Sequence, residues 1–132
     1  MKRTFKGSCH CGRVQMEADF DLSDGTFKCN CRSCTKNRAW LAVVKPDDFR
    51  LVSGKTELTE YESTNTRQFF CRTCGVRPFG RGHDEAAGGI FYAVNLGCLD
   101  DVDPTELAEA PVQYVDGRHD AWSSTPAETR HL

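Results

Sequence analysis

The chain of 132 residues lacks a long apolar run, a large excess of charge and low-complexity tracts. No stretch approaches the roughly 20 apolar residues of a membrane-spanning helix. The basic start, residues 1–6, leads into no apolar segment, so no signal peptide is expected. The 17 basic and 19 acidic residues give a net charge of -2, whereas nucleic-acid-binding proteins usually carry a basic excess or stripe. We therefore expect a cytoplasmic protein that binds neither membranes nor nucleic acid.

The length of the chain suits one domain. Hydrophobic residues make up 39% of the sequence, which is enough for one modest core. A chain of this size buries only about two-thirds of its unfolded surface, so cross-links would add to its stability. The prediction is a single domain over residues 1–132, with residues 123–132 as a flexible tail.

Most of the sequence patterns are typical of β-strands. From Arg13 to Phe20 polar and apolar residues alternate, as in a half-buried strand. Short runs rich in β-branched and aromatic residues predict further strands at 39–44, 49–52, 58–61, 67–70, 90–94 and 112–115. Glycine-rich turns are predicted at 80–82 and 88–89.

Helical signals are few. Residues 31–36 have room for a single turn. Asp103 is suited to an N-cap and Pro104 to the first helical position, and this helix must end before Pro111. The predicted fold is therefore mainly β, with short helical turns.

Cysteine is the outlier in the composition, with eight residues. In a reducing compartment thiols serve more often as metal ligands or catalytic groups than as disulfide partners. Close pairs make poor disulfides with each other but natural two-point chelates. The spacing favours metal binding over a disulfide framework, because seven cysteines form three tight groups, Cys9-x-Cys11, Cys29-x-Cys31-x-x-Cys34 and Cys71-x-x-Cys74.

The first and last groups together supply four thiolates, the number of ligands in a closed tetrahedral zinc site. Gly12 and Gly75 follow the second cysteine of each pair, where the tight turn needs a residue that tolerates positive φ. Such a site would close a loop of roughly 60 residues and supply much of the folding free energy. Its net charge of -2 would be offset in part by Lys6, Arg72 and Arg77. The predicted structural zinc ligands are Cys9, Cys11, Cys71 and Cys74.

The middle group, Cys29, Cys31 and Cys34, places three thiolates within six residues. Three protein ligands with a fourth position open are the pattern of a catalytic or ligand-exchanging zinc. Three thiolates leave such a site with a net charge of -1, which suits holding an incoming thiol as thiolate better than making hydroxide. Basic side chains nearby would attract an anionic thiol such as glutathione, namely Lys28, Arg32, Lys36 and Arg38.

Three other interpretations of this group stay open. Cys98 or a histidine would close the site and make it a second structural zinc. Cys31-x-x-Cys34 alone would be a redox pair, although the βαβ pattern of thioredoxin-like folds is absent. An iron–sulfur cluster would use the same thiols. If Cys98 is not a ligand, it is expected to be a buried small apolar residue.

Four stretches resemble the family of glutathione-dependent formaldehyde-activating enzymes, whose relatives include centromere protein V. They read GSCHCG at 7–12, CNCRSC at 29–34, FCRTCG at 70–75 and VNLGCLDD at 94–101, and they occur in family order. The resemblance covers residues 5–122. Many members carry histidine on both sides of the first middle cysteine, where this chain has Lys28 and Asn30.

The resemblance implies a β-rich zinc fold called a β-tent. It also implies a structural zinc on the first and last groups, a catalytic zinc on Cys29, Cys31 and Cys34, and condensation of glutathione with formaldehyde to S-(hydroxymethyl)glutathione. Two functions are therefore weighed, a carbon–sulfur lyase-type enzyme and a non-catalytic binding module with two structural zinc sites. An enzyme would need a proton donor, for which the candidates are Tyr92, His83 and His119. It would also need cations for substrate carboxylates, for which the candidates are Arg38, Arg67 and Arg81.

Overall fold

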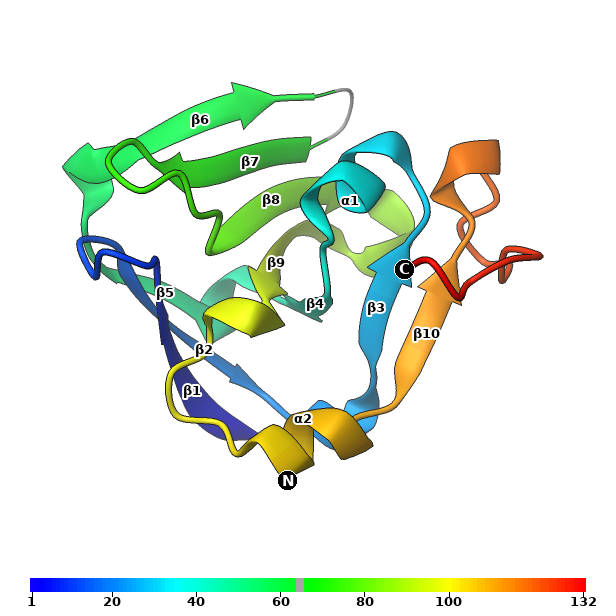
Figure 1. Cartoon of the computed structure of the whole chain (residues 1–132), viewed down its shortest axis with the longest axis horizontal. Coiled ribbons are helices and arrows are strands. Elements are labelled where there is room, and N and C mark those ends of the chain that lie inside the picture. Colours follow the sequence, from blue (N-terminus) through cyan, green and yellow to red (C-terminus); the bar gives the residue numbers. More distant parts are fainter. Residues whose placement is uncertain (64–65) are drawn as a thin grey trace.

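The computed structural model describes residues 1–63 and 66–132, which form two β-sheets with short helices at their edges (Figure 1). The smaller sheet is antiparallel and has the order β1–β2–β5, from β1 (Arg3–Ser8), β2 (Gln15–Phe20) and β5 (Phe49–Ser53). The larger sheet has the order β10–β3–β4–β9–β8–β7–β6. Its strands are β3 (Thr26–Cys29), β4 (Leu41–Val44), β6 (Leu58–Glu62), β7 (Thr66–Cys71), β8 (Phe79–Asp84), β9 (Gly89–Asn95) and β10 (Val112–Val115). The prediction of a mainly β fold is confirmed.

One strand pair of the larger sheet determines which part of the chain meets the middle cysteine group. Neighbouring strands are antiparallel except β10 and β3, which run parallel with Val115 opposite Cys29. The residues after β10 therefore emerge beside the residues after β3. This pairing brings positions 116–119 next to positions 29–31, although more than 80 residues separate them in sequence.

The core lies between the two sheets. The smaller sheet contributes Phe5, Met16 and Ala18, which are nearly inaccessible to solvent. Phe49 stacks on Tyr92 with ring centroids 4.3 Å apart and interplanar angle 6°, and it contacts Phe79 at 4.6 Å. These aromatic contacts hold β5 of the smaller sheet against β9 and β8 of the larger one.

Strands β1, β3 and β8 were not predicted, and the predicted turn at 80–82 is wrong. These residues lie inside β8, where Gly80 pairs with Gln68 and Ala93. Glycine is needed at position 82 because the ring of Phe91 lies across it. A Cβ atom there would come within 2.3 Å of the Phe91 ring. The two glycines thus mark a close approach inside a sheet, which resembles a turn when only the sequence is read.

Two short α-helices agree with the predicted helical positions. Helix α1 (Arg32–Asn37) has Cys31 as its N-cap. Helix α2 (Pro104–Glu109) begins after Asp103, whose carboxylate accepts a hydrogen bond of 2.8 Å from the Thr105 amide. Among the helices of the described residues, none is long and apolar enough to cross a membrane.

Candidate metal centres

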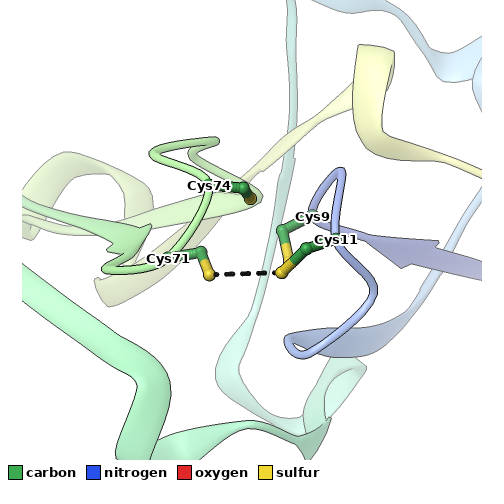
Figure 2. A group of neighbouring side chains, drawn as sticks. All are labelled: Cys9, Cys11, Cys71 and Cys74. Atoms are coloured by element: carbon green, nitrogen blue, oxygen red, sulfur yellow. Dashed lines mark hydrogen bonds between the residues drawn. The ribbon is translucent and has the colours of Figure 1, made fainter.

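The first and last cysteine groups meet at one point, as Figure 2 shows. Cys9 and Cys11 follow β1, whereas Cys71 ends β7 and Cys74 lies in the turn behind it. The sulfur atoms of Cys9 and Cys11 are 3.6 Å apart, and those of Cys11 and Cys71 are 3.7 Å apart. Zinc–sulfur bonds of about 2.3 Å in a tetrahedron require sulfur atoms about 3.8 Å apart. The four sulfurs therefore fit a tetrahedral metal ion.

The turns behind these cysteines have the predicted geometry. Gly12 and Gly75 have φ angles of 80° and 77°. The Gly75 amide donates to the Cys71 carbonyl over 2.7 Å, and the Val14 amide donates to the Cys9 sulfur over 3.3 Å. Backbone N–H groups that point at sulfur favour the thiolate form. The role predicted for the two glycines is confirmed.

A cation that the sequence analysis did not single out lies at this group. Hydrogen bonds from the backbone and then the side chain of Arg13 lower the pKa of Cys11. The amides of Cys11 and Val76 lower the pKa of Cys74 to about 6. Arg72, expected to offset the thiolate charge, instead donates to Glu57 over 3.3 Å. Arg13 directly follows Cys11 and Gly12 in the sequence, and this proximity could have identified it as a cation near the sulfurs.

The second candidate site, the triad, comprises Cys29, Cys31 and Cys34. Cys29 ends β3, and the other two lie at the start of α1. The sulfurs lie within 4.8 Å of one another. The Cys29 sulfur accepts a hydrogen bond from the Cys31 amide over 3.4 Å, and the Cys31 sulfur accepts one from the Cys34 amide over 3.3 Å. This geometry fits one metal ion with three sulfur ligands.

The electrostatics of the triad also favour a cation. Hydrogen bonds with Cys29 and then Cys34 lower the pKa of Cys31 to about 2. The pKa of Cys34 is raised, first by the hydrogen bond between Cys34 and Cys29. Three sulfurs this close disfavour one another's ionisation, so a negative charge concentrates on one of them. A divalent ion would stabilise all three as thiolates.

No further Cys, His, Asp or Glu of residues 1–63 and 66–132 joins the triad. Cys98 is 6% exposed, and its thiol donates to the Arg77 carbonyl over 3.7 Å. Burial raises the pKa of Cys98 to about 11. Cys98 is thus the buried small residue that was expected and not the fourth ligand. All eight cysteines are free, so no disulfide framework is present.

A cavity of about 130 Å³ adjoins two of the triad sulfurs. Of the four basic residues expected near the triad, Lys28 and Arg38 line this cavity. Trp40 forms an apolar wall, with its indole Nε1 donating to Thr26 over 2.7 Å. The Lys28 ammonium lies 5.2 Å from the centre of the Trp40 ring. The cavity is therefore apolar on one side and cationic on another.

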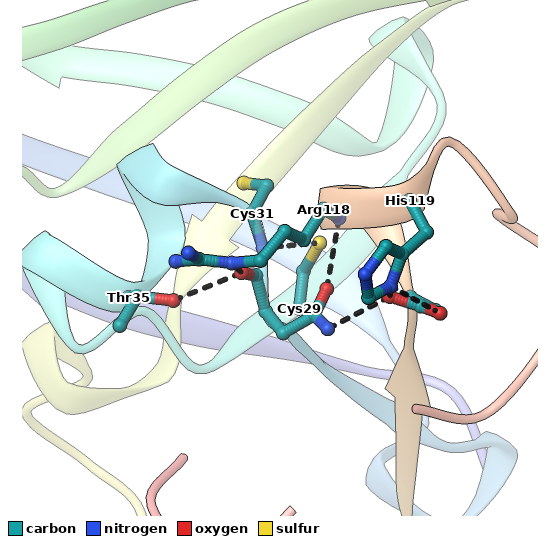
Figure 3. A network of polar contacts seen from close by, with 7 residues as sticks. Cys29, Cys31, Thr35, Arg118 and His119 are labelled. Atoms are coloured by element: carbon teal, nitrogen blue, oxygen red, sulfur yellow. Dashed lines mark hydrogen bonds and ion pairs between the residues drawn. The ribbon is translucent and has the colours of Figure 1, made fainter. Parts of the chain in front are cut away.

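Buried Asn30 connects the triad to the segment after β10, whose Arg118 and His119 lie near Cys29 and Cys31 in Figure 3. Its Nδ2 donates to the Asp116 carboxylate over 2.8 Å, and its Oδ1 accepts from the Arg118 amide over 2.9 Å. Its backbone carbonyl accepts from Arg118 Nε over 3.1 Å and from the Thr35 hydroxyl over 3.1 Å. Asp116 also contacts His119 Nδ1 at 2.9 Å. Asn30 thus fixes the backbone between two triad cysteines, a role that sequence reasoning missed because its partners are distant in sequence.

Gly117 lets the same segment approach the triad closely. A Cβ atom at this position would lie 2.5 Å from the Cys29 sulfur and 2.7 Å from the Trp122 ring. Trp122 is 56% exposed and covers Gly117 from outside. Only a residue without a side chain leaves room here for both groups.

Most of the other residues predicted to be proton donors or carboxylate-binding cations lie away from the triad. Tyr92 packs in the core against Phe49. His83, Arg67 and Arg81 line a separate open cavity near the β7 and β8 ends. Of the three proposed proton donors, only His119 is connected to the triad segment, through Asp116.

Comparison with known proteins found a matching family and a similar crystal structure. No curated protein matches the chain. A crystal structure of a Rhodobacter sphaeroides protein, a structural-genomics target, is similar with a TM-score of 0.67 and 32% sequence identity, over 82% of this chain and 99% of that one. The family model described as glutathione-dependent formaldehyde-activating enzyme matches residues 4–116, which include all eight cysteines. The chain therefore belongs to the family of glutathione-dependent formaldehyde-activating enzymes.

Proposed function

We propose that the protein is a zinc-dependent enzyme of carbon–sulfur bond chemistry that joins a thiol such as glutathione to a small aldehyde such as formaldehyde. It would act in a reducing compartment, the cytoplasm. A structural zinc would be held by Cys9, Cys11, Cys71 and Cys74, and a catalytic zinc by Cys29, Cys31 and Cys34. The observation that carries this proposal is the triad of close sulfurs, two of whose cysteines, Cys29 and Cys34, line a cavity together with Lys28 and Arg38.

Zinc bound by the triad would supply a fourth position at which a thiol loses its proton and is held as thiolate. Lys28 and Arg38 would attract a thiol of negative charge into the cavity. Trp40 would provide the apolar surface that excludes water on one side. The family name supports glutathione and formaldehyde as the substrate classes.

The overall reaction needs no oxidant or reductant. A sulfur–carbon bond forms between the thiolate and the aldehyde carbon, and the electron pair of the carbonyl double bond moves to oxygen. That oxygen takes up a proton, which balances the proton lost by the thiol. We assign this proton transfer to His119, because Asp116 connects it to the triad segment.

Cobalt substitution tests the proposal directly, because sulfur-to-cobalt charge-transfer bands grow with each bound thiolate. Titrating glutathione into the cobalt protein should increase these bands. A variant with Cys29, Cys31 and Cys34 all changed to serine should show no increase. Cys98→Ser is the matched control, since Cys98 is buried away from the triad, and it should behave like the wild type.

Product formation provides a second measurement. In a mixture of glutathione and ¹³C-formaldehyde, the wild-type zinc protein should form S-(hydroxymethyl)glutathione faster than the triple variant does. The hemithioacetal carbon of this product is followed by NMR. An unchanged cobalt spectrum at saturating glutathione would contradict the enzyme and support a non-catalytic module with two structural zinc sites.

A further inference from the structure

The last residues of the chain return to the triad cavity. The Asp116 amide donates to the Ser124 carbonyl over 2.9 Å, and Pro126 is buried. In Figure 1 the end of the chain lies beside β3, close to α1. There Arg38 Nη1 donates to the backbone carbonyl of His131 over 2.6 Å, and Leu132 lines the cavity together with Cys29 and Cys34. This segment lies beyond the residues that match the family model.

The position of Arg38 is fixed by the same turn that carries the triad. Arg38 is the residue directly after α1 and caps its C-terminus. Its φ of 54° is a left-handed conformation that is uncommon for residues other than glycine. Its amide caps the helix on the carbonyls of Cys34 and Thr35, and the next amide, of Ala39, donates to the Cys34 carbonyl over 3.0 Å. The backbone of Arg38 is thus held four residues after Cys34, and its side chain lines the cavity.

Arg38 donates to a neutral carbonyl in this structure, although its guanidinium is better suited to a carboxylate. A guanidinium has several N–H donors in a planar fork that matches both oxygens of a carboxylate. The His131 carbonyl is neutral and offers one oxygen. Lys28 adds a second cation to the cavity, and none of the described residues that line it has an acidic side chain. A carboxylate would therefore bind Arg38 more strongly than the carbonyl does.

The volume of the cavity indicates which thiols it can hold. Ligand pockets usually enclose about 300–1,000 Å³, whereas this cavity measures about 130 Å³ with Leu132 in its wall. A two-carbon or three-carbon thiol fits that space. A tripeptide thiol such as glutathione is larger than that space and would have to extend past Leu132.

We propose that Arg38 binds the carboxylate of the thiol substrate, and that the His131 carbonyl occupies Arg38 until such a thiol displaces it. The substrate class is a thiol bearing a carboxylate, and residues 129–132 compete with it for the site. This inference rests on the proposed function of the triad as a thiol-binding site.

Two thiols of equal length and different charge test the role of Arg38. In the cobalt protein, Arg38→Gln should weaken binding of 3-mercaptopropionate about tenfold, since a charge-assisted hydrogen bond is lost. Binding of neutral 2-mercaptoethanol should change less than about twofold, because it makes no such bond. Arg3→Gln is the matched control, because it removes the same charge from an exposed position of β1 that does not line the cavity. It should leave both affinities close to those of the wild type.

Shortening the chain tests the competition. A chain that ends at Glu128 should bind glutathione several-fold more tightly, with a smaller gain for 3-mercaptopropionate, because only the larger thiol needs the space. Leu132→Ala, which keeps the full chain, should move glutathione affinity in the same direction if the shortened chain does not fold. In hydrogen exchange of the wild type, glutathione should speed amide exchange at residues 129–132.

The outcomes separate this inference from the proposed function. If neither thiol changes the cobalt spectrum, the triad does not bind thiols and both proposals are overturned. If both thiols bind but Arg38→Gln weakens them equally, the carboxylate role of Arg38 is overturned while the proposed function stands. Glutathione affinity unchanged by both Leu132→Ala and the shortened chain would overturn the competition.

Discussion

The two cysteine groups share their chemistry and differ in what surrounds them. In the first, Cys9 and Cys71 are 3% and 0% exposed, and the ligands come from segments some 60 residues apart. In the triad all three cysteines are half-buried and lie within six residues. One cation, Arg13, contacts the four-cysteine group, whereas Lys28 and Arg38 line the cavity at the triad.

Under the proposed function, this difference would let one type of ligand serve two purposes. Four buried sulfurs from distant segments complete a tetrahedron, so a metal there would join the β1–β2 hairpin to the end of β7 and leave no position for substrate. Three local sulfurs at the edge of a cavity constrain little of the chain, but they leave one position accessible. The proposed function therefore gives the four-cysteine group a role in stability and the triad a role in chemistry.

The largest expected difference is between Cys71→Ser and Cys31→Ser. A structural zinc contributes an apparent free energy of about 10–16 kcal/mol, which matches or exceeds the total stability of about 5–15 kcal/mol typical of small proteins. Cys71→Ser should therefore abolish the folded state, while Cys31→Ser leaves a folded chain. Thermal melts followed by circular dichroism compare the two. Equal loss of folding in both variants would mean that both groups are structural.

A second prediction concerns the close approach at Gly117. In Gly117→Ala the new Cβ atom would collide with the Cys29 sulfur and the Trp122 ring, so we expect metal affinity at the triad to fall about tenfold or more. Competition with a chromogenic chelator measures this loss. Gly97→Ala is the control, because its nearest neighbour, Asn95 Oδ1, lies at an ordinary 3.5 Å. Identical chelator curves for the two variants would show that the segment after β10 does not restrain the triad.

A third prediction tests the hydrogen bonds of Asn30. Asn30→Ala leaves the Asp116 carboxylate and the Arg118 amide without their partner, which should lower the free energy of unfolding by about 1–3 kcal/mol. Asn37→Ala, at an exposed position of α1, should cost less than about 0.5 kcal/mol. Urea denaturation compares the two variants. A cost at Asn30 as small as that at Asn37 would contradict the role assigned to Asn30.

The smallest predicted effect is a pH dependence in the sheet that leads to Cys9 and Cys11. Hydrogen bonds from Arg50 and Thr4 hold the pKa of Asp19 well below its usual value. A carboxylate with a lowered pKa in the folded state stabilises the fold above its unfolded pKa of about 4, and this contribution is lost as the pH falls further. The stability difference between wild type and Asp19→Asn should therefore shrink from about pH 5 downwards. A difference that stays constant down to about pH 3 would contradict this linkage.

Much of the fold could be predicted from local patterns. The alternation around Met16 and Ala18 identified β2, and Asp103 with Pro104 identified the start of α2. The patterns failed for β8, where Gly80 and Gly82 leave room for side chains of the neighbouring strands. They also failed for β1, where only Phe5 and Gly7 are buried and the apolar signal is too short to stand out. Close approach and sparse burial depend on neighbours that are distant in the sequence.

The two cysteine groups, the number of cysteines in each and the glycines of the turns behind them could be identified from the sequence alone, because chelate spacing and positive φ are local properties. The surroundings of each group, in contrast, depend on how the chain folds. The parallel pairing of β10 with β3 brings Asp116, Gly117 and Arg118 to the triad, and the return of the chain places His131 on Arg38. These contacts join positions more than 80 residues apart, so they arise from strand order and packing and leave no pattern in either segment alone.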